Sequence, residues 1–113
     1  GGSNIIKLRG RSSFQSPAYN AVKMIEAAMG GEKFTLPAGC YVNHDKLGFK
    51  NVMMAMPSTI DKTGVHFVEP TGTKEEIADL NKSYEHLCKM RDEIVELGIV
   101  PPVDKWKEMN PNL

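Results

Sequence analysis

The spacing of the apolar residues changes twice along this chain, and it divides the sequence into helical and extended parts. Between Ala18 and Met29 apolar residues recur every three or four positions, as they do on one buried face of a helix. Across residues 34–68 they alternate with their neighbours or run together, as in strands, and helical spacing returns from Ile77 to Leu97. Because no helix separates the strands, this order predicts an α+β fold of antiparallel strands packed by helices.

Two helices are expected before the strands. Residues 5–9 have the pattern of the second half of a helix, and a second helix is expected to begin near Ser13 or Ser16, either of which can cap it. Pro17 then falls in the first turn, where no backbone donor is needed, and Gly30 with Gly31 stands where a C-terminal cap belongs. Since the sequence has no initiator Met and enters a helix at once, we expect it to be part of a larger protein.

Turn and capping signals delimit the later elements. Residues 61–64 have the composition of a tight turn, so the run before them and residues 65–68 after them are expected to form an antiparallel hairpin. Thr73 and Glu76 have the spacing of a capping box, and we expect a helix of about seven turns behind them, ending at Gly98.

Size and charge narrow the possible functions. With 113 residues, 41% of them hydrophobic, the chain is expected to form a single domain. Lys plus Arg and Asp plus Glu are 14 each, so no overall field attracts nucleic acid, and no nucleic-acid partner is expected. No apolar run approaches the roughly 20 residues that span a bilayer, and no signal peptide opens the chain. We therefore expect a soluble, cytoplasmic protein with no membrane partner.

The residue types that most often carry catalysis or bind metals are scattered. Cys40 and Cys88 lack a CxxC spacing and fall in an expected strand and an expected helix, which indicates reduced, buried thiols. His44, His66 and His86 lie in three different elements without an obvious catalytic partner, so structural or solvent-facing roles are favoured for them. No metal site is predicted, and no catalytic residue is assigned.

One local group of cations and hydroxyls precedes the second helix. Three basic residues alternate around Gly10, and three serines follow them within six positions. The group consists of Lys7, Arg9, Arg11, Ser12, Ser13 and Ser16. Such a group can bind a phosphate or a carboxylate, and the plainer alternative is a solvated helix end, where cations are favourable.

Residues 6–10, which read IKLRG, are followed by a small hydroxyl residue and a long amphipathic helix, and this segment resembles the malate and lactate dehydrogenase family. The antiparallel strands are similar as well, and residues 83–97 lie where those enzymes place their last helix. The resemblance covers essentially the whole chain and is strongest to the bacterial malate dehydrogenases. It implies that residues 1–113 are the C-terminal, substrate-binding domain and that the N-terminal NAD-binding domain is absent.

The resemblance also implies an activity, a cofactor and partners. Members transfer a hydride between NAD and the 2-position of a hydroxy acid, and malate dehydrogenases interconvert malate and oxaloacetate in the tricarboxylic acid cycle. The partners implied are a 2-hydroxy or 2-oxo dicarboxylate and further copies of the chain in a homo-oligomer. The catalytic histidine, its aspartate and the substrate-clamping arginines precede this segment in the family, so the chain alone is expected to be inactive.

Only a few site residues can be carried over from the family. Ser12 matches the small residue that lines the substrate pocket, and Ser13 is a reserve candidate for the same role. Ser16, one helical turn after Ser12, matches the position that faces the nicotinamide ring of NAD. Arg11 replaces an often uncharged residue, and its positive potential suits a dicarboxylate.

Two other interpretations stay open. A free-standing α+β module could use Lys7, Arg9 and Arg11 to capture an anion or a peptide. A dimerisation domain could pair its apolar helix faces with those of another copy.

Overall fold

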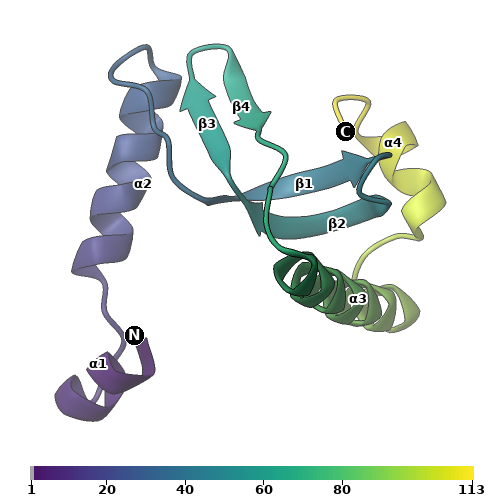
Figure 1. Ribbon diagram of the computed structural model, residues 1–113, viewed down its shortest axis with the longest axis horizontal. Helices are drawn as coiled ribbons and strands as arrows, with labels where there is room; N and C mark the ends of the chain where they lie inside the picture. The colour runs from purple at the N-terminus through teal and green to yellow at the C-terminus, as the bar shows by residue number, and fades with distance from the viewer. Residues whose placement is uncertain (1) are drawn as a thin grey trace. The chain divides into compact units, whose positions relative to one another are not determined.

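The computed structural model describes residues 2–113, and the α+β class expected from the sequence is confirmed (Figure 1). The elements, in chain order, are α1 (Gly2–Arg9), α2 (Gln15–Ala28), β1 (Ala38–His44), β2 (Phe49–Met56), β3 (Ser58–Asp61), β4 (Gly64–Phe67), α3 (Lys74–Glu96), the 3-10 turn η1 (Val103–Lys105) and α4 (Trp106–Met109). Among residues 2–113, no helix combines the length and the apolar composition that crossing a bilayer requires.

These elements belong to two compact units. The first unit contains the chain as far as Leu36 together with Ser58–His66. The second unit contains Pro37–Pro57 and Phe67–Leu113. Each unit therefore joins stretches that are distant in sequence, and each is built around one pair of strands.

The core of the second unit lies between the β1–β2 hairpin and α3. The two strands are antiparallel, and the buried side chains form one cluster of Cys40, Val42, Phe49, Val52, Met54 and Met56. The helix packs Leu80, Tyr84 and Leu87 against this cluster, and the rings of Phe49 and Tyr84 stack with their centroids 4.4 Å apart. The apolar face of α3, with its helical spacing, thus packs against the face of the hairpin to which the alternating apolar residues point.

β2 changes face at Asn51, which the sequence pattern did not predict. Phe49 and Val52 are both buried although three positions separate them, and Asn51 between them has a φ of 52°. Asn is among the few residues that adopt this left-handed conformation readily. Arg91 of α3 donates two hydrogen bonds there, from Nη1 to the carbonyl oxygens of Lys50 (3.1 Å) and Asn51 (3.0 Å). The helix therefore binds the strand where the alternation breaks.

The expected limits of α3 are confirmed. The Oγ1 of Thr73 accepts from the backbone N–H of Glu76 (3.2 Å), and Oε2 of Glu76 accepts from the backbone N–H of Thr73 (2.8 Å). At the other end Gly98 has a φ of 70°, and the N–H of Ile99 bonds to the carbonyl of Ile94 (3.0 Å). This is the hydrogen-bond pattern of a Schellman motif, which favours glycine.

The serine cap expected for the second helix is wrong. The N-cap of α2 is Phe14, no side chain among residues 2–113 caps it, and Ser16 lies inside the first turn. Starting at Gln15 places Pro17 third in the helix, where the missing N–H costs no intrahelical bond. The expected glycine end is confirmed, because the N–H of Gly31 bonds to the carbonyl of Glu26 (2.8 Å) and Gly30 has a φ of 93°.

The buried face expected for α2 is also wrong. Of its 14 residues, all described, Ala27 alone is buried. Val22, Ile25 and Met29 are 52%, 58% and 83% exposed. The helix contacts the short strand β3, which is too small to cover its apolar stripe. Within this chain the stripe therefore faces solvent.

The strand expected to begin at Phe34 begins at Ala38 instead. Phe34 pairs only through a single antiparallel bridge with Ile60, whose N–H and carbonyl both bond to it (2.8 and 3.1 Å). Leu36 is exposed, and Pro37 has no N–H to continue a ladder. The turn expected at residues 61–64 is confirmed, since β3 pairs with β4 across a two-residue connection, but the apolar run 52–56 expected as its first strand belongs to β2 and pairs with β1.

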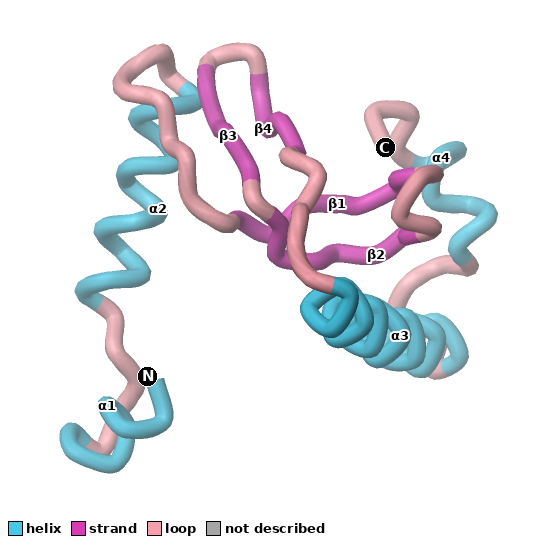
Figure 2. Tube along the Cα trace, viewed as in Figure 1, coloured by secondary structure: helices cyan, strands magenta, loops and turns pink. Residues whose placement is uncertain are grey.

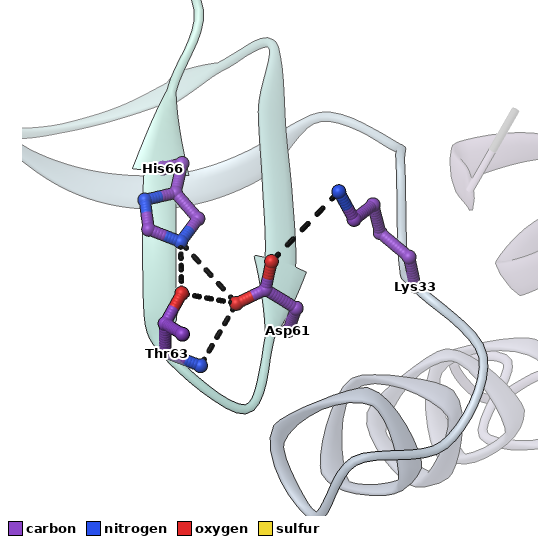
Figure 3. Close-up of polar contacts among 4 residues, drawn as sticks. All are labelled: Lys33, Asp61, Thr63 and His66. Carbon is purple, nitrogen blue, oxygen red and sulfur yellow. Dashed lines mark hydrogen bonds and ion pairs between the residues drawn. The ribbon is translucent and has the colours of Figure 1, made fainter.

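A cluster of polar side chains holds the tip of this hairpin (Figure 3). Oδ1 of Asp61 accepts from the backbone N–H of Thr63 (2.8 Å) and from the Thr63 hydroxyl. Nε2 of His66 lies 2.6 Å from Oγ1 of Thr63 and 3.3 Å from Oδ1 of Asp61. Nζ of Lys33 lies 3.8 Å from Oδ2 of the same carboxylate. Asp61 thus has three partners and closes the turn as an Asx turn does.

We expect Asp61 to make the stability of the first unit depend on acid. Hydrogen bonds from the hydroxyl and the N–H of Thr63, and then from His66, lower the pKa of Asp61 from 3.8 to about 2. A carboxylate with a lowered pKa stabilises the fold above its unfolded pKa, and this contribution is lost as the pH falls through the folded pKa. In Asp61→Asn the loss of stability between about pH 4 and pH 2 should be smaller than in the unmodified chain. Thermal unfolding followed by circular dichroism at each pH measures it.

Asp104 provides the matched control for this substitution. It is exposed in η1, and its carboxylate has no hydrogen bond or ion pair within residues 2–113. Asp104→Asn should leave the acid dependence unchanged. An equal dependence in Asp61→Asn and Asp104→Asn would contradict the assignment.

Candidate functional site

The serines singled out by the sequence lie in and next to the connection between α1 and α2, which Figure 2 shows as a loop between two helices. Helix α1 ends at Arg9, and Gly10 turns the chain with a φ of 71° while its N–H bonds to the carbonyl of Ile6 (2.8 Å). Ser12 and Ser13 follow in the connection, and Ser16 lies in the first turn of α2. One short stretch, residues 9–16, therefore carries all three hydroxyls, and we call it the serine segment.

The geometry within the serine segment differs from the expectation in one respect. Ser16 was expected one helical turn after Ser12, but α2 begins only at Gln15. The two hydroxyls therefore do not share a helix face. Ser12 and Ser16 are exposed and Ser13 is half-buried, so all three can be reached by a ligand.

Two arginines of this segment are held against one aromatic ring. The guanidinium carbons of Arg9 and Arg11 lie 5.6 and 5.3 Å from the centroid of Phe14. Contacts of this kind between a cation and an aromatic face are attractive and orient the guanidinium group. Phe14 was not among the predicted site residues, because a lone aromatic residue between polar neighbours gives no signal of its own.

The electrostatic environment of the serine segment is positive. Within residues 2–113, no carboxylate forms an ion pair with Lys7, Arg9 or Arg11. The first turn of α2 carries no acidic residue and is not capped by a side chain of the described chain, so the positive end of the helix dipole adds to these charges. An anionic group near Ser12 would meet this combined charge.

A separate cleft of about 280 Å³ lies in the same unit. It is lined by Tyr19, Asn20 and Lys23 of α2 and by residues 32–36. None of the three serines lines it, and Lys23 already pairs with Glu26 at 2.8 Å. We therefore assign it no part in the serine segment.

The three histidines lie outside the serine segment and in three different elements, β1, β4 and α3. No partner of His66 is obvious in the sequence, but its Nε2 lies beside Thr63 and Asp61 at the hairpin turn, which agrees with the structural role expected for it (Figure 3). A carboxylate only accepts hydrogen bonds, so the Thr63 hydroxyl donates to Asp61 and accepts from Nε2–H of His66. His66 therefore acts as a donor that stabilises the turn, and this arrangement does not activate Thr63 as a nucleophile.

The other expected site types can be located as well. His44 accepts the N–H of Leu47 at Nδ1 (3.2 Å), and His86 is exposed on α3. Cys40 is buried in β1 and Cys88 is half-buried in α3, and neither forms a disulfide. Across residues 2–113, no three side chains of His, Cys, Asp or Glu come together as a metal ion would need.

Comparison of the sequence with known proteins shows the family to which this chain is similar. The model of the lactate/malate dehydrogenase α/β C-terminal domain matches residues 1–97. The malate dehydrogenase of Sorangium cellulosum (strain So ce56) is 32% identical over 93 residues, which are 81% of this chain and 29% of that protein. The malate dehydrogenase of Bacillus israeli is 33% identical over 87 residues, 75% of this chain and 28% of the relative. The malate dehydrogenase of Pelagibacter ubique (strain HTCC1062) is 39% identical over 70 residues, which are 61% of this chain and 22% of that protein.

The matched residues contain the whole serine segment, both strand pairs and α3, whereas η1 and α4 lie beyond them. The chain spans less than a third of the length of these relatives, at 28–29% of the first two. Because the family match covers nearly all of the fold described above, this chain belongs to the lactate/malate dehydrogenase family and corresponds to its α/β C-terminal domain.

Proposed function

We propose that residues 1–113 supply the substrate-binding part of an NAD-dependent malate dehydrogenase. The observation that carries the proposal is the match over residues 1–97, together with relatives that are all named malate dehydrogenase. In this proposal the NAD-binding domain, the catalytic histidine with its aspartate and the substrate-clamping arginines belong to the remainder of the enzyme. Residues 1–113 alone are then inactive.

In the proposed enzyme, the serine segment binds the reacting end of a 2-hydroxy or 2-oxo dicarboxylate. Ser12 contacts the substrate, with Ser13 as the alternative contact. The exposed hydroxyls and the uncompensated charge of Arg9 and Arg11 support this, because a dianion is attracted to a positive site. Phe14 restricts the guanidinium groups, so less conformational entropy is lost when a carboxylate binds.

The residues present fit only one end of NAD. Ser16 is exposed in the first turn of α2 and can face a nicotinamide ring, but the sequence contains no Gly-rich fingerprint for the pyrophosphate. When bound, NAD accepts or supplies the hydride at the 2-position of the substrate. The contribution of this chain is to place the substrate, to keep its carboxylates near positive charge and to leave one hydroxyl beside the ring.

The first experiment compares NADH oxidation by the product of the complete reading frame with that by residues 1–113 alone. Oxaloacetate and pyruvate are offered separately, and absorbance of NADH is followed. We expect activity only from the complete product, with the higher kcat/KM for oxaloacetate. NADH oxidation by residues 1–113 alone, or no activity with either acid, would contradict the proposal, and the second outcome would favour an anion-binding module.

Ser12→Ala in the complete product tests the substrate contact. Loss of one hydrogen bond to the substrate should lower kcat/KM for oxaloacetate by about 5- to 30-fold, which corresponds to about 1 to 2 kcal/mol. Ser83→Ala, an exposed serine of α3, is the matched control and should leave kcat/KM unchanged. Unaltered kinetics in Ser12→Ala would reject Ser12 as a contact and leave Ser13 to be tested in the same way.

We also propose that the enzyme is a homo-oligomer in which α2 pairs with another copy. The exposed stripe of Val22, Ile25 and Met29 supports this, because apolar patches of this kind mark interaction surfaces. Ile25→Glu places a charge in the stripe and should shift the complete product to a smaller species in sedimentation velocity. Val65→Glu alters an equally exposed residue of β4 and should leave the sedimentation coefficient unchanged. The same coefficient in Ile25→Glu and the unmodified product would refute this role of α2.

A further inference from the structure

The second unit contains an apolar pocket that the proposed dehydrogenase activity does not use. It has a volume of about 320 Å³ and is bounded by β2, α3 and α4. Its apolar lining consists of Val52, Met53, Leu87, Met90, Ile94 and Trp106. We propose that this pocket binds a small, uncharged, apolar molecule with about the size of two fused six-membered rings.

The charged group at the edge of the pocket is already paired, and this favours an uncharged ligand. Nη1 of Arg91 donates to the carbonyls of Lys50 and Asn51, while Nε and Nη2 bond to Asp92 at 2.8 and 2.7 Å. The side-chain oxygen of Asn51 accepts from the Tyr41 hydroxyl, while the amide N–H groups of Asn51 have no partner within residues 2–113 and can donate to a neutral acceptor. Nε1 of Trp106 donates to the carbonyl of Pro101 (2.7 Å). A charged ligand would lose its water without gaining an unpaired opposite charge, whereas an apolar one needs none.

The same hydrogen bonds favour a small molecule over a peptide strand. An extended peptide that adds to the edge of a sheet needs free backbone acceptors on the edge strand. At this point of β2 the carbonyls of Lys50 and Asn51 are occupied by Arg91. Strand addition would have to displace a guanidinium group that is itself paired with Asp92. The pocket can therefore bind a ligand through side-chain contacts but has no free backbone carbonyls here for pairing with a peptide strand.

The volume sets the size of the ligand. Pockets that bury small ligands begin at about 300 Å³, and an apolar cavity of about 150 Å³ is known to take one benzene ring. At about 320 Å³ this pocket has room for roughly twice that volume. Two of its walls are methionines, whose unbranched thioether chains adapt to ligands of different outline and contact aromatic rings favourably.

The wall formed by Trp106 is a feature of this chain outside the matched part of the family domain. The family match ends at residue 97, and α4 begins at Trp106. The indole ring lies 6.5 Å from the ring of Tyr41, centroid to centroid, so the end of the chain is folded back onto the β1–β2 hairpin. Without this segment the pocket would have only two of its three sides.

Trp106 also provides the measurement in the complete product, because energy transfer that is lost in Trp106→Phe can be assigned to this side chain. Dansylamide is a neutral two-ring probe that accepts excitation energy from tryptophan, and dansyl sulfonate is its anionic analogue. We expect dansylamide to give saturable energy transfer from Trp106 with one site per chain. We expect dansyl sulfonate to bind about fivefold more weakly or worse, because its charge has no free partner in the pocket.

Met90→Glu tests the location of the site. Met90 is half-exposed on α3, so a charge there is tolerated by the fold but lies in the pocket wall, and binding should weaken by about tenfold or more. Met109→Glu is the matched control, since Met109 is exposed in α4 and does not line the pocket, and its affinity should stay within about twofold of the unmodified chain. Met53→Gln repeats the test from β2 should Met90→Glu change the circular dichroism spectrum.

Three results would overturn the proposal. The first is transfer that does not saturate or is equally strong in Met90→Glu and Met53→Gln. The second is tighter binding of dansyl sulfonate than of dansylamide, which would make the site an anion site. The third is a dimer in sedimentation that Met90→Glu dissociates, which would show that another copy fills the pocket. None of these readings uses NADH oxidation, so failure here is distinct from failure of the proposed dehydrogenase.

Discussion

The packing of α3 against the β1–β2 hairpin is the contact on which the second unit depends. A two-stranded hairpin is marginal alone, because one of its faces would leave apolar side chains in water. Here that face is covered by the helix, and the ring of Phe49, only 1% exposed, stacks on Tyr84. The hydroxyl of Tyr84 accepts a hydrogen bond from the N–H of Lys50. Arg91, about two helical turns further along α3, donates to the carbonyls of Lys50 and Asn51. A single helix face thus supplies both the apolar cover and the polar anchor.

The features that could be predicted from the sequence are those decided within a few residues. The capping box at Thr73, the glycine ends at Gly30 and Gly98, and the turn at residues 61–64 all depend on local backbone chemistry, and all are present. The face change at Asn51 could not be predicted, since it relies on Arg91, which is 40 positions away in sequence. The exposed stripe of α2 shows the same limit, because periodicity indicates an apolar face without saying what covers it.

The same distinction between local and long-range features applies to the candidate site. Ser12, Ser13 and Ser16 could be placed in one segment because they are neighbours in sequence and resemble a family motif. Their exact arrangement could not, since the helix begins two residues later than Ser13 and uses Phe14 as its N-cap. The contact of Arg9 and Arg11 with the ring of Phe14 depends on three side chains at once, and the spacing of these residues in the sequence does not indicate it. The contacts of His66 with Thr63 and Asp61 could not be predicted from the alternation of residues along β4, because these partners lie in the turn and on the other strand of the hairpin.

Two methionines in the wall of the apolar pocket have a chemical consequence. Met53 and Met90 are 60% and 50% exposed, so dissolved oxidants can reach both thioethers. Conversion to the sulfoxide replaces a flexible apolar side chain with a polar one and is reversible by reductases. Oxidation would therefore make the wall of this pocket more polar while leaving Phe49 and the buried core chemically unchanged. Two sulfur atoms thus make the polarity of this pocket depend on the oxidants to which the protein is exposed.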